Sequence, residues 1–111
     1  MTIMRRAALC AIAATARIAA AQAPVPEPTE LVDAQHCMFC HTQDMTFLGP
    51  SFQDIAARYR GDPDAPAALE RKLRLGGPAH WGDAPMPPAL ERGGPLSAQE
   101  AHRLVQWVLS Q

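Results

Sequence analysis

The sequence predicts an all-α domain of about four short helices joined by long loops. Three observations predict this fold class. Apolar residues recur at helical spacing in several segments, and two of these segments begin with patterns typical of helix capping boxes. No segment shows the strict alternation of a half-buried strand. Eleven prolines and seven glycines among 111 residues keep the helices short and lengthen the loops between them.

The N-terminal half of the domain is expected to contain two helices. The first begins at Thr29, its expected N-cap, and ends near Cys40. A loop follows, and Ser51 opens a second helix that ends near Tyr59. The inner faces are expected to consist of Leu31, Val32 and Gln35 in the first helix and Phe52, Ile55 and Tyr59 in the second.

The C-terminal half is expected to contain two more helices. Asp64 caps a third helix that runs through Leu75 and ends at the following glycine pair. Residues 79–94 are rich in proline and are expected to form a loop. Ser97 opens the last helix, which ends at Leu109. The apolar positions of these helices are Leu69 and Leu73 in the third and Leu104, Trp107 and Val108 in the last.

Residues 1–21 are expected to be a signal peptide that is removed from the mature chain. Two arginines precede an apolar stretch at 7–16, and Ala19, Ala20 and Ala21 offer small residues for cleavage. Cleavage after Ala23 is an alternative. A retained membrane anchor is another, although the apolar run is much shorter than the ~20 residues of a spanning helix. Lipid attachment at Cys10 is a third, and the bulky Leu9 before it argues against it.

Cleavage after residue 21 changes the charge and the cysteine count. It leaves residues 22–28 as an exposed, proline-rich leader and 29–111 as the domain. Three arginines are lost, so seven of the 10 basic residues remain against 11 acidic ones, a net charge of about −4. This balance argues against a nucleic-acid-binding protein, which needs a basic surface. Two of the three cysteines remain, and no cysteine is left over for a disulfide.

Cys37, Cys40 and His41 form a Cys-x-x-Cys-His motif, which is typical of covalent attachment of a c-type haem. Two thiols three residues apart can bond to two vinyl groups of one haem, and the following histidine can bind its iron. A thioredoxin-like redox pair and half of a zinc site are the alternatives. The first expects a strand–helix context, which is missing here, and the second needs two more ligands at similar spacing.

Met86 is the candidate ligand for the opposite side of the iron. Pro85, Pro87 and Pro88 restrict the backbone around it. A thioether is a soft ligand that favours ferrous iron and raises the reduction potential. The competing candidates are Met38, inside the attachment motif, Met45, four residues after His41, and His80, which is close to Met86 in sequence.

Three pieces occur in a fixed order: the motif at 37–41, Leu48-Gly49-Pro50, and the loop 81–88 with its tryptophan and methionine. In this order the chain resembles a class I cytochrome c, most closely the small bacterial type that transfers electrons in the periplasm. The resemblance covers Thr29–Gln111. It implies the class I cytochrome c fold, with the short helices packed around one covalently attached haem c and His41 and Met86 as axial ligands.

The resemblance also implies roles for residues around the haem. The Pro50 carbonyl would accept a hydrogen bond from the second ring nitrogen of His41. Trp81 would donate to a haem propionate, and Lys72, or alternatively Arg74, would lie near the propionates. One position departs from close relatives, in which an asparagine shortly after the methionine can donate to its sulfur. Ala89 stands in that region here and cannot donate.

The expected function is therefore electron transfer by a periplasmic monohaem cytochrome c, which shuttles single electrons between respiratory partners and is not an enzyme. We expect a monomer, without nucleic acid and without stable membrane insertion after signal removal, that docks briefly on redox partners with a basic face. The alternative is a haem-based ligand sensor, or a small c-type haem subunit of a periplasmic oxidoreductase, in which Met86 is displaced. We also expect the chain without haem to be largely unfolded.

Overall fold

The computed structural model describes residues 25–78 and 84–111. The helices in these ranges are α1 (Thr29–Ala34), the 3-10 turn η1 (Cys37–Phe39), α2 (Phe52–Arg58), α3 (Ala65–Leu75), α4 (Ala89–Arg92) and α5 (Ala98–Leu109). The ranges contain no strand, so the predicted all-α class is confirmed; one isolated antiparallel bridge pairs Gly77 with Met86. None of the described helices is long and apolar enough to cross a bilayer. The expected signal peptide lies outside the described residues.

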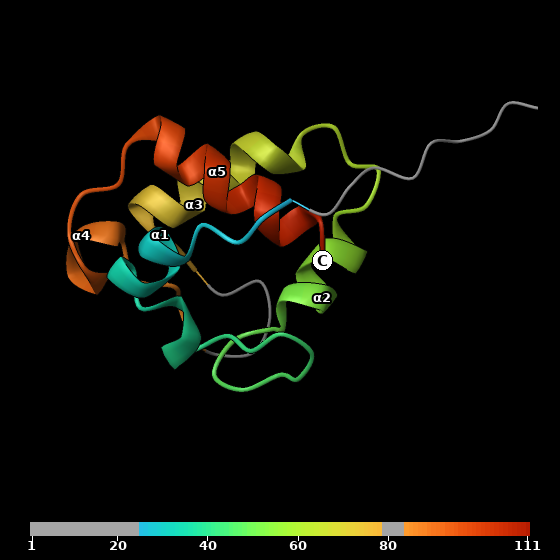
Figure 1. Cartoon of the computed structure of the whole chain (residues 1–111), viewed down its shortest axis with the longest axis horizontal. Helices are drawn as coiled ribbons and strands as arrows, with labels where there is room; N and C mark the ends of the chain where they lie inside the picture. Colours follow the sequence, from blue (N-terminus) through green and yellow to red (C-terminus); the bar gives the residue numbers. More distant parts are fainter. Residues whose placement is uncertain (1–24, 79–83) are drawn as a thin grey trace, which may run out of the picture.

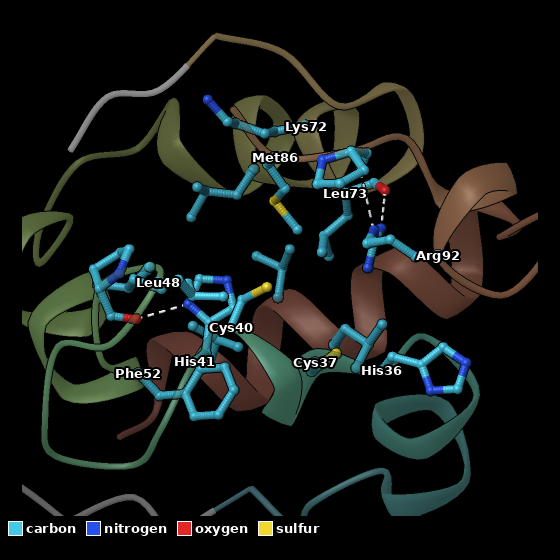
Figure 2. A pocket seen from close by; sticks show the side chains of 18 of the residues that line it. His36, Cys37, Cys40, His41, Leu48, Phe52, Lys72, Leu73, Met86 and Arg92 are labelled. Atoms are coloured by element: carbon cyan, nitrogen blue, oxygen red, sulfur yellow. Dashed lines mark hydrogen bonds between the residues drawn. The ribbon is translucent and has the colours of Figure 1, made fainter. Parts of the chain in front are cut away.

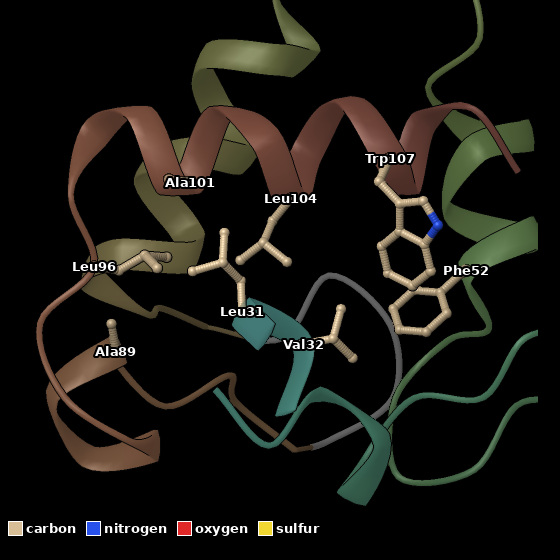
Figure 3. Packing of buried hydrophobic residues seen from close by; sticks show 8 residues of the cluster. All are labelled: Leu31, Val32, Phe52, Ala89, Leu96, Ala101, Leu104 and Trp107. Atoms are coloured by element: carbon tan, nitrogen blue, oxygen red, sulfur yellow. The ribbon is translucent and has the colours of Figure 1, made fainter. Parts of the chain in front are cut away.

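Helix α5 is the centre of the core. It packs against α3, α2 and α1 (Figure 1). Figure 3 shows Leu104 and Trp107 of α5 facing the side chains that α1 and α2 contribute. The Trp107 and Phe52 rings have their centroids 4.8 Å apart and are inclined at 59°, a favourable tilted arrangement. The core cluster consists of Leu31, Val32, Phe52, Ala89, Leu96, Ala101, Leu104 and Trp107.

The first helix is shorter than the sequence predicts. It ends at Ala34, and His36 adopts a left-handed conformation with φ of 53°. This conformation is uncommon for a residue other than glycine, and it redirects the chain into η1, which carries the cysteine motif. The ring of His36 stacks on that of Phe39, with centroids 5.0 Å apart. Thr29 is not the N-cap, because Pro28 occupies that position.

A second difference is α4, which lies in the segment 79–94 that the sequence predicts to be a loop. This helix is a single turn that begins after Pro88. A helix of four residues is too short to show apolar periodicity. Its first residue, Ala89, is buried in the core cluster, so packing against the core contributes to its stability. The predicted ends of the helices at Leu75 and Leu109 are confirmed.

Two serines begin helices as predicted. Ser51 accepts a hydrogen bond from the backbone N–H of Asp54, at 3.0 Å. Ser97 forms a complete capping box with Glu100, in which each side chain accepts from the other residue's backbone N–H, at 3.1 and 2.8 Å. Asp64 occupies the N-cap of α3, but its side chain makes no capping hydrogen bond. The caps of α2 and α5 therefore follow from local sequence, whereas α3 begins without one.

Replacement of the capping serine of α5 tests this account. Ser97→Ala is expected to lower the free energy of unfolding of the holoprotein by about 1 kcal/mol, because the N–H of Glu100 loses its acceptor. Thr29→Ala is the matched control, with an expected change of less than about 0.5 kcal/mol, because Thr29 caps no helix. Denaturant unfolding measures both. A larger loss from Thr29→Ala than from Ser97→Ala would contradict the assigned caps.

Candidate haem site

A cavity of about 280 Å³ lies between η1, α2, α3, α5 and the loop at 84–87. Its volume is near the lower end of the ~300–1,000 Å³ typical of ligand sites. Most of its lining is apolar, including Ile55, Leu69, Leu73, Leu104 and Val108. Figure 2 shows the Met86 side chain entering from one side, and Cys40 and His41 lying on the opposite side. The candidate residues that line it are Cys37, Cys40, His41, Pro50, Lys72 and Met86.

The structure does not place the methionines that compete with Met86 in the cavity wall. Met38 and Met45 are absent from the cavity wall, and they are 47% and 66% exposed. His80 lies outside the described residues, as does Trp81. Among the described residues, Met86 is therefore the methionine that faces the cavity.

A backbone carbonyl holds the His41 ring in one orientation. Its Nδ1 lies 2.7 Å from the carbonyl oxygen of Pro50. A carbonyl only accepts hydrogen bonds, so Nδ1 carries the proton, and the lone pair of the neutral ring is on Nε2. The ring also packs against Phe52, with centroids 5.5 Å apart. The loop that brings Pro50 here is closed by a 2.8 Å hydrogen bond from the N–H of Gly49 to the carbonyl of Cys40.

Met86 is fixed through its backbone. Its N–H donates to the carbonyl of Gly77 and its carbonyl accepts from the N–H of Gly77, at 3.2 and 3.1 Å. Gly76 allows this approach: its φ is +68°, and a Cβ there would lie 2.5 Å from the Met86 carbonyl oxygen. Ala89, which stands in the region where close relatives have an asparagine donor to the sulfur, is buried in α4.

The two cysteines fit haem attachment better than the alternatives. Both are half-buried, and burial raises the pKa of the Cys37 thiol. Redox-active pairs instead have a thiol with a lowered pKa. The described residues contain no group of three or more histidine, cysteine or acidic side chains that could hold a metal ion.

Lys72, rather than Arg74, faces the cavity. Its ammonium donates to the carbonyl of Pro78, and partial burial lowers its pKa. The guanidinium of Arg74 instead donates from Nε to the carbonyl of Leu96, at 3.1 Å.

Arg92 is a cavity residue that sequence reasoning missed. It lies in α4, and its half-buried guanidinium reaches the carbonyls of Pro87, Leu73 and Gln35. Burial lowers its pKa. The available signal was weak: Glu91 places an acidic residue in the first turn of α4, which favours a helix start but does not indicate that Arg92 reaches the cavity.

A helical domain with an apolar cavity beside a Cys-x-x-Cys-His turn defines the class of small c-type haem proteins. The family model described as Cytochrome c matches residues 28–111. The chain belongs to the cytochrome c family. Members of this family bind one covalently attached haem c, and Cys37 and Cys40 fit its attachment motif.

Individual relatives agree with this assignment. The chain is 35% identical to cytochrome c-551 of Pseudomonas aeruginosa over 108 residues, which cover 97% of this chain and 99% of the relative. It is 37% identical to cytochrome c-552 of Hydrogenobacter thermophilus over 81 residues, 73% of this chain and 78% of the relative. The crystal structure of wild-type Nitrosomonas europaea cytochrome c552 superimposes with a TM-score of 0.64 at 33% identity, covering 73% of this chain and 95% of that one.

The glycine pair after α3 tests how the methionine loop is held. Gly76→Ala and Gly77→Ala both place a side chain at a positive φ, and each is expected to lower the free energy of unfolding by about 1–3 kcal/mol. Gly76→Ala is expected to lose about 1–3 kcal/mol more, because its Cβ overlaps the Met86 backbone, whereas a Cβ at Gly77 meets nothing within 4 Å. Equal losses in denaturant unfolding would show that the close approach does not matter.

Proposed function

We propose that this protein is a periplasmic carrier of single electrons between respiratory partners, and that His41 and Met86 are the axial ligands of its haem iron. The observation that carries the proposal is the pair of backbone-held ligand candidates on opposite sides of one apolar cavity. When bound, the haem supplies the redox chemistry, since its iron cycles between ferric and ferrous states. The side chains of this protein would hold the haem, orient its ligands and contact the redox partners.

His41 has the properties of a fixed ligand. Its hydrogen bond to the Pro50 carbonyl selects the tautomer with a lone pair on Nε2 and holds the ring plane. Such an acceptor also raises the basicity of a ligating imidazole. The role assigned to Pro50 therefore depends on its backbone oxygen, which the rigid proline ring helps to orient.

Met86 is proposed as the second axial ligand, a soft thioether opposite the His41 imidazole. The bridge to Gly77 and the flanking prolines hold the backbone, so the sulfur is presented with little freedom to move. A thioether favours the ferrous state and raises the potential. If His41 and Met86 both bind the iron, no open coordination position would be left for a substrate, which is why we propose a carrier rather than an enzyme.

Lys72 and Trp81 are proposed to interact with the haem propionates. The Lys72 ammonium lies at the cavity wall beside the Pro78 carbonyl, where a cation would offset propionate charge. Trp81 offers an indole N–H as a donor. A cation beside the propionates and a donor to them would fix the group at its polar edge while the apolar side chains exclude water.

Export and docking complete the proposal. The signal peptide at 1–21 would deliver the chain to the periplasm, and the acidic balance of the mature chain favours partners with a basic face. Large apolar side chains are exposed around the attachment turn: Met38, Phe39, Met45, Phe47 and Leu48. Exposed apolar side chains of this kind suit a brief encounter with a redox partner.

Removal of the proposed soft ligand tests the function. Met86→Ala is expected to keep covalent haem, to lose the methionine-to-iron charge-transfer band at the red end of the ferric spectrum, and to lower the potential by more than ~59 mV, which is a tenfold change in a one-electron equilibrium. Met45→Ala is the matched control and should change neither property, because Met45 is exposed and away from the cavity.

Two results would contradict the proposal, one from the Met86→Ala variant and one from the unmodified protein. If Met86→Ala kept the wild-type band and potential, Met86 would not be the ligand, and His80 would be the next candidate. If the unmodified ferric protein were high-spin, or its ferrous form bound carbon monoxide promptly, the protein would be a sensor or an oxidoreductase subunit rather than a carrier.

A further inference from the structure

We infer that Arg92 is a positioning residue for the Met86 ligand: its guanidinium ties the methionine loop to the ends of α1 and α3 and thereby resists displacement of the sulfur from iron. This inference rests on the proposed ligation by Met86. It concerns how firmly the ligand is held rather than whether it binds.

The contacts of Arg92 join three separate parts of the chain. Its Nε donates to the carbonyl of Pro87, the residue directly after Met86, at 3.0 Å. Its Nη2 donates to the carbonyl of Leu73 in the last turn of α3. Its Nη1 lies 3.5 Å from the carbonyl of Gln35, the C-cap of α1. Figure 2 shows the guanidinium beside Leu73 at the edge of the cavity, with dashed lines for its hydrogen bonds to carbonyl oxygens.

The positive charge of Arg92 is stabilised by the backbone carbonyls at the ends of α1 and α3. In the part of the chain that the structure describes, the ion pairs are His102 with Glu70 and Arg103 with Glu30, and neither involves Arg92. The ends of α1 and α3 instead offer carbonyls without intrahelical partners. These carry the negative end of the helix dipole, which stabilises a cation. Two helix ends therefore compensate the half-buried charge.

The backbone brings Arg92 to this position through a close approach. Gly93 follows it, and a Cβ at Gly93 would lie 1.8 Å from the carbonyl oxygen of Ala34. Only glycine allows α4 to come this near to the end of α1. The buried Gln35 side chain adds a hydrogen bond to the carbonyl of Gly94, at 3.1 Å. These contacts anchor α4 independently of Arg92, so its replacement should leave the short helix in place.

Arg92 also supplies a hydrogen-bond donor to the Met86 segment, which the Ala89 side chain cannot do. Ala89 offers the Met86 sulfur no side-chain donor, and the described hydrogen bonds that hold the Met86 segment involve its backbone. The bridge to Gly77 fixes Met86 itself, and Arg92 fixes the next carbonyl. A lysine could not replace it, since an ammonium lacks the planar fork that reaches three acceptors at once.

The test uses imidazole as a competitor for the Met86 position on the ferric holoprotein. Arg92→Lys and Arg92→Gln are both expected to bind imidazole about tenfold more tightly than the unmodified protein, the factor for loss of about one charge-assisted hydrogen bond. Arg74→Gln is the matched control. It removes an arginine–carbonyl hydrogen bond of α3 away from the Met86 loop, so imidazole affinity should not change even if stability falls.

A double-variant comparison separates positioning from general destabilisation. In a Met86→Ala background, Arg92→Gln should leave the imidazole affinity unchanged, because no sulfur remains to be held. Unchanged affinity in both Arg92 single variants, or an equal increase in the Met86→Ala background, would overturn the inference. If Arg92→Gln does not give folded holoprotein, Arg92→Lys decides the question. Loss of the proposed function itself would be recognised separately, by a missing methionine-to-iron band in the unmodified protein.

Discussion

The apolar cavity beside the cysteine motif is the constraint on which the rest of the structure depends. Side chains from η1, α2, α3, α5 and the methionine loop all end on its surface. Phe52, Leu104 and Trp107 belong both to the buried core cluster and to the cavity lining. A domain of this size has little apolar surface to bury, so a covalently bound haem, which the cytochrome c family carries, completes the core rather than being added to a finished one.

The two sides of the cavity are built in different ways, and this difference bears on electron transfer. On one side a single hydrogen bond joins His41 to Pro50, within a short loop. On the other side, the described contacts that hold the loop are the backbone bridge between Met86 and Gly77 and the hydrogen bond from the Arg92 guanidinium to the Pro87 carbonyl. Both arrangements restrict motion around the proposed ligands. Ligands restricted in this way would keep the same geometry in both oxidation states of a bound haem iron, which is what a carrier of single electrons requires.

Much of the fold could be predicted because its signals are local. Ser51 and Ser97 cap their helices through neighbouring N–H groups, and the cysteine motif identifies the cofactor from five residues. The missed features depend on distant contacts. The single turn of α4 places Ala89 in the core cluster, and the left-handed conformation of His36 is uncommon for its residue type. Arg92 has no motif, since its acceptors come from positions 35, 73 and 87.

The claim that haem completes the core is tested most directly by a comparison of helical content with and without it. The measurement is far-ultraviolet circular dichroism, followed through denaturant unfolding, of the holoprotein and of a Cys37→Ala, Cys40→Ala variant prepared without haem. The account predicts that the haem-free variant loses most of its helical signal and its cooperative transition. A haem-free variant with the helical content and cooperative unfolding of the holoprotein would contradict it.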